Sequence, residues 1–299
     1  MTLAPAWLGE LRREIDAALP GMLPARHEEA GAVHDAMAWA LVSPGKRIRP
    51  ALALAVGRIY RVDAARLMTP ACAVEMVHAA SLILDDLPSM DDSPTRRGRP
   101  ACHVAFGEST AILAAIGLLS RAFGLVAGEG GAWGRERLRS AVARRLAAAI
   151  GTDGVIGGQH EDLELARRKG SAAEASLERL EFIHSHKTGS LFIASAELGA
   201  VISGATPGEV EALAAYARNL GLAFQITDDL IDAIGDEESA GKPVRADTGR
   251  PTFVSLCGIE GARALARDLV ETSVRSLEPF GHRAASLVEL ARFIAVRDR

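Results

Sequence analysis

The chain has 299 residues, 48% of them hydrophobic, so it can bury a sizeable core in one large domain or two ordinary ones. Its 34 basic and 38 acidic residues give a formal charge of −4, which argues against a nucleic-acid binder, since such proteins usually carry a basic excess. Cys72, Cys102 and Cys257 lie far apart and form neither a disulfide framework nor a zinc-ligand pattern. We therefore expect a reduced, cytoplasmic protein.

The first twenty residues contain acidic side chains and lack a long apolar core, which is not typical of a signal or transit peptide. No uninterrupted run of about 18 apolar residues occurs in the sequence, so we expect no membrane span.

Helical signals dominate the sequence. Alanine is abundant, aromatic residues make up only 4%, and apolar residues recur at three- and four-residue spacing, whereas no strand-like alternation or fixed-period repeat is found. These features predict one all-α domain over residues 1–299.

Thr69-Pro70 resembles an N-cap followed by proline at the first helical position, and it predicts a helix that runs to about Asp85. Further helix boundaries are predicted at Pro207 and Pro251 and at the glycine clusters 128–131 and 154–158.

Four aspartates follow that first apolar helix, namely Asp85, Asp86, Asp91 and Asp92. Because Pro88 disfavours a regular helix, we expect the helix to end near Asp86 and a tight turn to bring Asp91 back toward Asp85. Three or four residues make one helical turn, so His78 and Ser81 share the helix face of Asp85.

A second acidic cluster lies in the segment 224–243. In an ideal helix Gln225, Asp228, Asp229 and Asp232 fall within an arc of about 100°, and their neighbours are apolar. Clustered carboxylates on a buried helix repel one another and are costly unless a cation neutralises them. Aspartates without histidine or cysteine suit a hard cation such as Mg²⁺, which usually completes its shell with water and substrate phosphates.

Basic residues accompany both acidic clusters. Guanidinium groups bind phosphate bidentately and stay charged at any working pH. The sequence therefore predicts two anionic groups, one held through metal ions and one held directly by basic side chains. The candidates are Lys46, Arg47, Arg49, Arg96, Arg97, Lys187 and Lys242.

Five motifs in order make the sequence resemble the trans-isoprenyl diphosphate synthases (the polyprenyl synthetase family), most closely a bacterial geranylgeranyl diphosphate synthase. They are "GKRIRP", "DDLPSMDD" with "RRGRPACH", "GGQHEDL", "HKTGSLF" and "GLAFQITDDLID" with "GKP". The resemblance implies the isoprenoid synthase fold, a single-domain bundle of many helices around a deep central cavity. It also implies a homodimer.

The resemblance implies a role for each matching residue. Three Mg²⁺ ions would be held by Asp85, Asp86, Asp91, Asp162, Asp228, Asp229 and Asp232. Arg96 and Lys242 would contact an allylic diphosphate, with Arg250 where the family usually has lysine. Isopentenyl diphosphate would be held by Lys46, Arg49, His78 and Arg97. The reacting carbons would be lined by Lys187, Thr188 and Gln225.

The implied reaction is ionisation of the allylic C–O bond, attack by the double bond of isopentenyl diphosphate, and loss of a proton. In this family the residues four and five before the first aspartate help to set product length. Here they are Ser81 and Ala80, both small, which predicts a product of twenty carbons or more. Alternatives are a farnesyl or longer-chain synthase, a class I terpene cyclase, which needs only one diphosphate, and a regulatory subunit, which typically loses acids from one motif.

Overall fold

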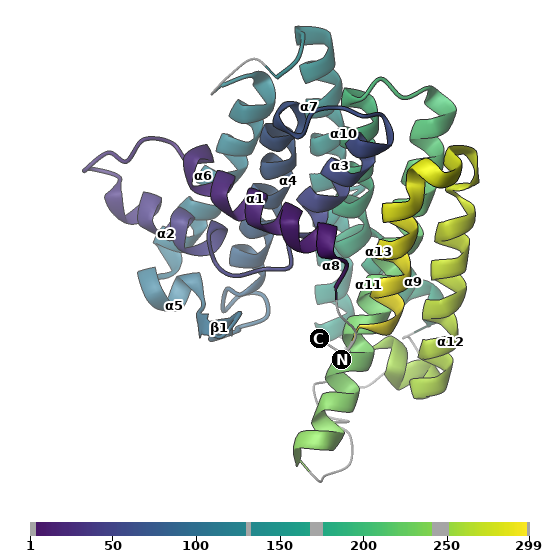
Figure 1. The fold of residues 1–299 in the computed structure, drawn as a ribbon. Coiled ribbons are helices and arrows are strands. Elements are labelled where there is room, and N and C mark those ends of the chain that lie inside the picture. Colours follow the sequence, from purple (N-terminus) through teal and green to yellow (C-terminus); the bar gives the residue numbers. More distant parts are fainter. Residues whose placement is uncertain (1–3, 130–132, 168–175, 241–250, 298–299) are drawn as a thin grey trace. The chain divides into compact units, whose positions relative to one another are not determined.

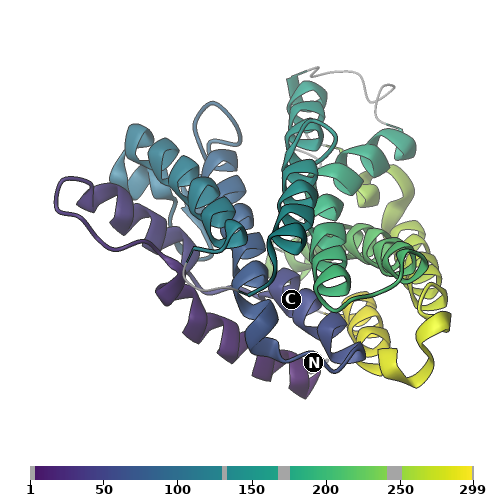
Figure 2. The ribbon, with the colours of Figure 1, turned by 90° about the horizontal axis from the view of Figure 1, so that it is seen from above.

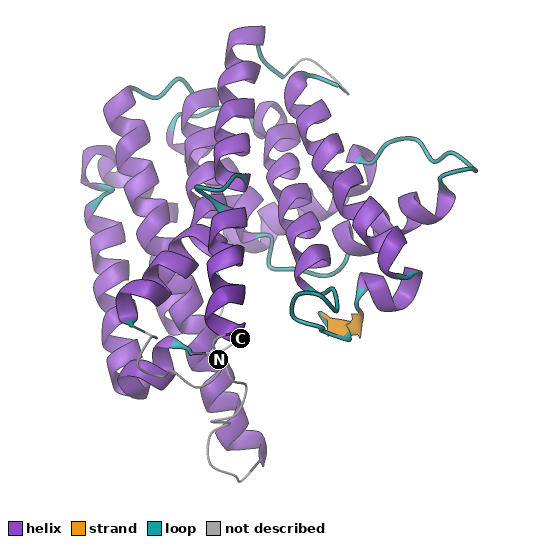
Figure 3. Ribbon diagram, turned by 180° about the vertical axis from the view of Figure 1, so that it is seen from behind, coloured by secondary structure: helices purple, strands orange, loops and turns teal. Residues whose placement is uncertain are grey.

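The computed structural model describes residues 4–129, 133–167, 176–240 and 251–297, with no side chains described for 235–240. Helices fill nearly all of this part of the chain. Its only strands are the two-residue β1 (Thr95–Arg96) and β2 (Arg99–Pro100), which pair antiparallel (Figure 3). The predicted all-α fold is confirmed.

The chain divides into two compact units. The N-terminal unit comprises residues 6–146 and 198–205, and the C-terminal unit comprises residues 1–5, 147–197 and 206–299. That the two form one domain around a deep central cavity stays a prediction.

The N-terminal unit is built around α4 (Ala64–Asp85), which packs against α3 (Ile48–Ile59) and α6 (Glu108–Ala127) (Figures 1 and 2). The surface of α4 is apolar almost all round, as expected of a helix enclosed by others. The other helices of this unit are α1 (Ala6–Met22), α2 (Gly31–Leu41), α5 (Cys102–Phe106) and most of α7 (Glu136–Ile150).

The predicted start of α4 at Pro70 is wrong, whereas its predicted end at Asp85 is confirmed. The helix begins at Ala64, where the side chain of Asp63 accepts a hydrogen bond from the Ala65 amide at 3.0 Å. Residues 64–68 are mostly good helix formers, so the helix passes through Pro70 despite its missing N–H.

Two helices of the described chain, α4 and α6, are long and apolar enough to cross a membrane by length and composition alone. Of their most apolar windows, 67% is buried in α4 and 39% in α6. The burial of α4 is that of a core helix, while α6 keeps much of its apolar surface uncovered.

The C-terminal unit is built around α11 (Pro207–Ala240), which packs against α12 (Phe253–Arg275), α13 (Ala285–Val296) and η2, a π-helical turn at Ser185–Gly189. Its remaining elements are α8 (Val155–Arg167), α9 (Leu177–His184), most of α10 (Ser190–Ile202) and η3 (Glu278–Ala284). A hydrophobic core that includes Ile183, Ile226 and Phe253 joins α9, α11 and α12.

The predicted boundaries at Pro207, Pro251 and Gly128 are confirmed. Pro207 is the first residue of α11, Pro251 precedes the N-cap of α12, and Gly128 caps α6 with φ +111°. The boundary predicted at the glycine cluster 154–158 is also confirmed, because α8 begins at Val155, although the helix includes the last two glycines of the cluster.

Candidate functional site

The first aspartate segment is a tight turn fixed by backbone hydrogen bonds. The amide of Asp91 donates to the carbonyl of Asp85 at 3.0 Å, and the amide of Ser93 donates to the carbonyl of Asp86 at 3.2 Å. Asp92 adopts a left-handed conformation with φ +49°. The predicted return of Asp91 toward Asp85 is confirmed, and both side chains remain partly exposed.

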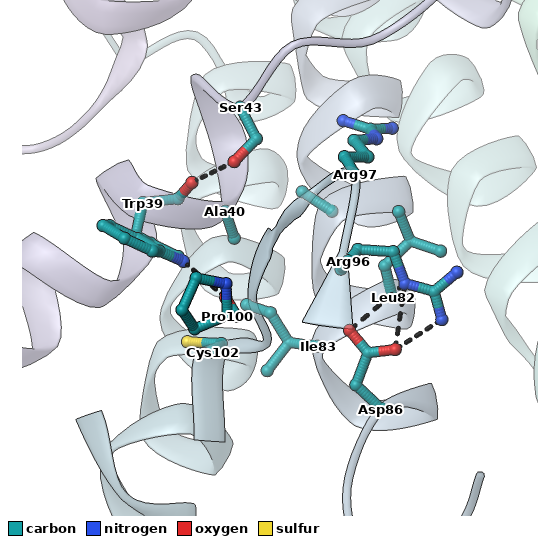
Figure 4. Close-up of a pocket in the computed structure, with 11 residues that line it drawn as sticks. Trp39, Ala40, Ser43, Leu82, Ile83, Asp86, Arg96, Arg97, Pro100 and Cys102 are labelled. Atoms are coloured by element: carbon teal, nitrogen blue, oxygen red, sulfur yellow. Dashed lines mark hydrogen bonds and ion pairs between the residues drawn. The ribbon is translucent and has the colours of Figure 1, made fainter. Parts of the chain in front are cut away.

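Asp86 differs from its neighbours because it is buried and holds an arginine. The Nε of Arg96 donates to its two carboxylate oxygens at 2.9 and 3.2 Å, and Nη2 also bonds to Oδ1 (Figure 4). Burial lowers the pKa of Arg96, but the hydrogen bond and charge of Asp86 outweigh it, so the pKa is raised. This pair ties the β-hairpin that carries Arg96 to the end of α4.

Arg47, one of the basic residues predicted to hold an anionic group, is instead a buried structural anchor. Its buried guanidinium donates to Asp16 at 2.8 Å, to Glu75 at 2.6 Å, and to the carbonyls of Leu41 and Ser43 at 3.1 and 2.7 Å. These bonds fix the loop 42–47, which joins α2 to α3. Glu75 was the available signal, since a lone acid inside an apolar helix requires a buried cationic partner.

Several basic side chains of the N-terminal unit lie close to this loop. Arg49 Nη1 lies 3.3 Å from His78 Nε2. The Arg97 guanidinium approaches Gly45 so closely that a Cβ there would stand 2.9 Å from Nη1. Burial, and then the charges of Arg49 and Arg97, lower the pKa of His78, so the imidazole is neutral at pH 7. Lys46 is exposed on the same loop. Such a cluster favours an anionic ligand.

A small cavity of about 30 Å³ lies beside these residues, between the end of α4 and the hairpin (Figure 4). That volume holds water but no prenyl chain. The cavity is lined by Trp39, Ala40, Ser43, Ala79, Leu82, Ile83, Asp86, Arg96, Arg97, Pro100 and Cys102.

The two residues predicted to set product length lie one turn before Asp85. Ala80 is fully buried in the N-terminal unit, and the Ser81 hydroxyl donates to the carbonyl of His78 at 2.8 Å. Both positions are therefore small residues within the packed part of α4.

In the C-terminal unit a close helix approach positions Lys187. A Cβ on Gly158 would stand 2.2 Å from the Lys187 backbone nitrogen, so only glycine permits α8 to pack against η2 here. The Lys187 ammonium donates to Asp162 Oδ2 at 2.7 Å. Gly158 thereby brings two predicted site residues, Lys187 and Asp162, together.

Thr188, Gln225 and Asp229 form a hydrogen-bonded chain. The Thr188 hydroxyl donates to Gln225 Oε1 at 3.2 Å, and the Gln225 amide donates to Asp229 Oδ1 at 3.1 Å. The Phe253 amide, at the N-terminus of α12, donates to Asp229 Oδ2 at 3.0 Å. Burial raises the pKa of Asp229 to about 6, with the charges of Asp228 and Asp232 adding to it against the two hydrogen bonds.

Asp228 is paired with the end of the described chain. Arg297 Nη2 donates to Asp228 Oδ1 at 2.6 Å and to the carbonyl of Phe224 at 2.9 Å. Asp232 lies one turn further along α11 and is exposed. Two other predicted site residues, Lys242 and Arg250, lie outside the described residues.

The residues of each unit fit a hard cation by their chemistry. Both segments supply carboxylate oxygens, the ligands that Mg²⁺ prefers. Two features of the C-terminal unit show that its carboxylates favour a nearby cation, namely the raised pKa of Asp229 and the pairing of Asp228 with a guanidinium. Within the described residues no three His, Cys, Asp or Glu side chains gather closely enough to hold a metal alone.

Comparison with known proteins identifies the family. The model of the polyprenyl synthetase family matches residues 32–279. The chain belongs to this family. It is 41% identical over 274 residues to the chloroplastic geranylgeranyl pyrophosphate synthase of Capsicum annuum. This alignment covers 91% of this chain and 73% of the relative. It is 39% identical over 294 residues to the farnesyl diphosphate synthase of Geobacillus stearothermophilus, covering 98% and 97%.

Solved structures agree. A farnesyl/geranylfarnesyl diphosphate synthase (FPP/GFPP synthase) from Zymomonas mobilis superposes with a TM-score of 0.85 at 34% identity, covering 97% of each chain. A geranyltransferase from Legionella pneumophila gives 0.83 at 30% identity, covering 96% of this chain and 95% of that one. The isoprenoid synthase fold and prenyltransferase activity predicted from the sequence are therefore confirmed.

Proposed function

We propose that this prenyltransferase is a geranylgeranyl diphosphate synthase, which extends an allylic diphosphate with isopentenyl diphosphate to twenty carbons. The observation that carries the product assignment is the pair of small residues before the first aspartate, Ala80 and Ser81. The pepper relative named geranylgeranyl pyrophosphate synthase supports it. A farnesyl product is the second candidate, because the Geobacillus relative that matches nearly end to end is named a farnesyl diphosphate synthase.

The acidic residues have a proposed role in metal binding. The family resemblance implies that Asp85, Asp91, Asp162, Asp228, Asp229 and Asp232 would hold three Mg²⁺ ions on the allylic diphosphate. When bound, these ions supply positive charge that favours departure of the diphosphate. Asp86 supports the site indirectly by positioning Arg96.

The basic residues bind the two diphosphates. Arg96, with Lys242 and Arg250, contacts the allylic diphosphate. Lys46, Arg49 and Arg97 hold isopentenyl diphosphate, and neutral His78 offers a ring nitrogen as donor to the same group. The Arg47 anchor keeps Lys46 and Arg49 in place, because its buried guanidinium binds the loop that carries Lys46 and precedes Arg49.

Lys187, Thr188 and Gln225 act at the reacting carbons. The oxygen atoms of Thr188 and Gln225, fixed by their mutual hydrogen bond, stabilise the positive charge that develops on the allylic carbons. The double bond of isopentenyl diphosphate attacks this cation, and the departing diphosphate takes the proton that is lost. Water must be excluded, since it would quench the cation.

A product assay tests this proposal. The purified protein is incubated with isopentenyl diphosphate, Mg²⁺ and either dimethylallyl, geranyl or farnesyl diphosphate, and the dephosphorylated products are identified by mass spectrometry. A dominant twenty-carbon alcohol supports the proposal, and Ser81→Phe should then shift the main product to fifteen carbons. A cyclic hydrocarbon would favour a cyclase, and no elongation would favour a regulatory subunit.

We also infer a homodimer in the cytoplasm. Three large apolar side chains of α6 are exposed, namely Ile112, Leu113 and Ile116. Neighbouring exposed apolar side chains favour contact with a protein partner over contact with water. The free cysteines suit a reducing compartment. Leu113→Glu should convert the dimer to a monomer in size-exclusion chromatography with light scattering, whereas Ile156→Glu, equally exposed on α8, should not.

A further inference from the structure

Arg297 is buried in the C-terminal unit and paired with Asp228. Its side chain is only 1% exposed, although it follows the last residue of α13. The guanidinium carbon lies 4.0 Å from the centre of the Phe224 ring, and Nη2 reaches both the Phe224 carbonyl and Asp228. A charged group at this depth requires a partner, and its carboxylate partner is Asp228.

The scaffold beneath Arg297 is well fixed. The hydroxyl of buried Tyr216 on α11 donates to the carbonyl of Leu287 on α13 at 2.7 Å. The hydroxyl of Ser273 on α12 donates to the carbonyl of Tyr216 at 3.0 Å. These bonds tie α11, α12 and α13 together, so Arg297 and Asp228 are presented to each other by rigid elements.

The position of Arg297 is nevertheless incompletely satisfied. Its Nε and Nη1 are buried and have no hydrogen-bond partner within the described residues. Unpaired buried donors are costly, so the guanidinium is held mainly by its charge pair with Asp228. Removing the negative charge from Asp228, or neutralising it with another cation, would remove the main interaction that holds the Arg297 side chain in this position.

We propose that Arg297 is the resident counter-cation of Asp228, which a divalent metal ion displaces on binding. The inference rests on the proposed metal role of Asp228. The carboxylate that accepts from Arg297 is the one proposed to bind a metal ion, and one carboxylate cannot serve a buried guanidinium and a divalent ion with full strength at once. Arg297 is thus a positioning residue that lowers metal affinity in the absence of diphosphate and offsets part of the negative charge on α11.

The test measures metal affinity directly, with Mn²⁺ as a paramagnetic substitute for Mg²⁺. Free Mn²⁺ is followed by electron paramagnetic resonance, with and without inorganic pyrophosphate. Arg297→Gln should bind Mn²⁺ about tenfold more tightly than the wild type, since the competing cation is gone. The matched control is Arg292→Gln, which makes the same change at an exposed site on α13 and should leave the affinity unaltered.

The sign of the effect separates competition from a structural role. An arginine that only supports the fold would weaken metal binding when replaced, or leave it unchanged, and either result would overturn the inference. No Mn²⁺ binding by either protein would overturn it too. If Arg297→Gln does not fold, Arg297→Lys is used instead. Its ammonium should pair less well with Asp228, so the affinity for Mn²⁺ should rise a few-fold.

Hydrogen exchange gives a second readout that does not depend on catalysis. Saturating Mn²⁺ and pyrophosphate should speed amide exchange in residues 294–297 of the wild type, whereas in Arg297→Gln exchange should be fast beforehand. Unchanged exchange in the wild type would contradict displacement. A protein that shows the affinity difference but makes another prenyl chain would overturn only the proposed product.

Discussion

The two aspartate segments reach their geometry by different means. In the N-terminal unit, Asp85 and Asp91 are brought together by the backbone itself, through a turn closed by the Asp91 amide. In the C-terminal unit, Asp228 and Asp229 lie in the same turn of the regular helix α11, and groups from other elements bind their side chains. Arg297 follows α13, and the Phe253 amide belongs to α12.

This difference has a physical consequence. A turn closed by backbone hydrogen bonds depends little on the charge of Asp85 and Asp91. Carboxylates gathered on one helix depend on distant donors and cations, so their protonation and metal binding are coupled to the packing of the unit. We therefore expect the first segment to respond to mutation mainly in activity and the second to respond also in stability.

The largest expected effect is on activity in the first segment. Asp85→Asn removes a charged metal ligand while preserving size, so kcat/KM should fall by about 10²- to 10³-fold, with little change in Tm. Steady-state kinetics and thermal unfolding measure the two. Asp92→Asn is the control, because it lies in the same turn and asparagine tolerates its left-handed backbone. Equal losses in both variants would contradict the proposed role of Asp85.

The next effect is on the stability of the N-terminal unit. Glu75→Gln leaves the buried guanidinium of Arg47 without its main countercharge and should cost about 3 kcal/mol of unfolding free energy. Urea denaturation measures it. Glu260→Gln, a surface partner of Arg263, is the control and should change stability by less than about 0.5 kcal/mol. A small effect at Glu75 would mean that Asp16 alone sustains the anchor.

Much of this architecture could be predicted from the sequence because it depends on local chemistry. Proline and the spacing of the acids predicted the turn after α4, and helical periodicity placed Gln225 and Asp229 on one face. Contacts between distant segments could not be predicted this way. The pairing of Asp86 with Arg96, the anchor at Arg47 and the approach of Arg297 to Asp228 each join residues from different elements.

One prediction from the sequence, the start of α4 at Pro70, was wrong. Pro70 and Gly158 are residues that usually interrupt helices, yet both lie inside one. Tertiary packing decided the outcome in each case. The cap at Asp63 and the apolar surroundings carry α4 through Pro70, and the close approach of Lys187 requires Gly158 within α8.

A third prediction extends the comparison to η2. Gly158→Ala would place a methyl group against the Lys187 backbone and should destabilise the C-terminal unit by about 2 kcal/mol. The displaced Lys187 should also lower kcat. Gly208→Ala, in the first turn of α11 with open space around it, is the control and should be neutral or stabilising. A normal Tm in Gly158→Ala would show that α8 can move aside.

The smallest expected effect is the pH dependence of the stability of the metal-free protein, which Asp229 in the second segment should cause. Because the folded pKa of Asp229 is about 6, above its usual value of 3.8, the folded state keeps a proton that the unfolded state has lost between those values. Stability should therefore fall as pH rises from about 4 to 6 and then level off. Asp229→Asn removes this dependence, and at pH 7 it should be more stable than the wild type by about 1–2 kcal/mol.

Denaturation midpoints measured from pH 4 to 8 in EDTA test this prediction, with exposed Glu211→Gln as the control on the same helix. The advantage of Asp229→Asn should vanish near pH 4, where both states of the wild type bind the proton. Saturating Mg²⁺ and pyrophosphate should also reduce it, because a bound cation favours the ionised carboxylate. An advantage that is the same at every pH would instead place its origin in packing, and the second segment would then be as insensitive to charge as the first.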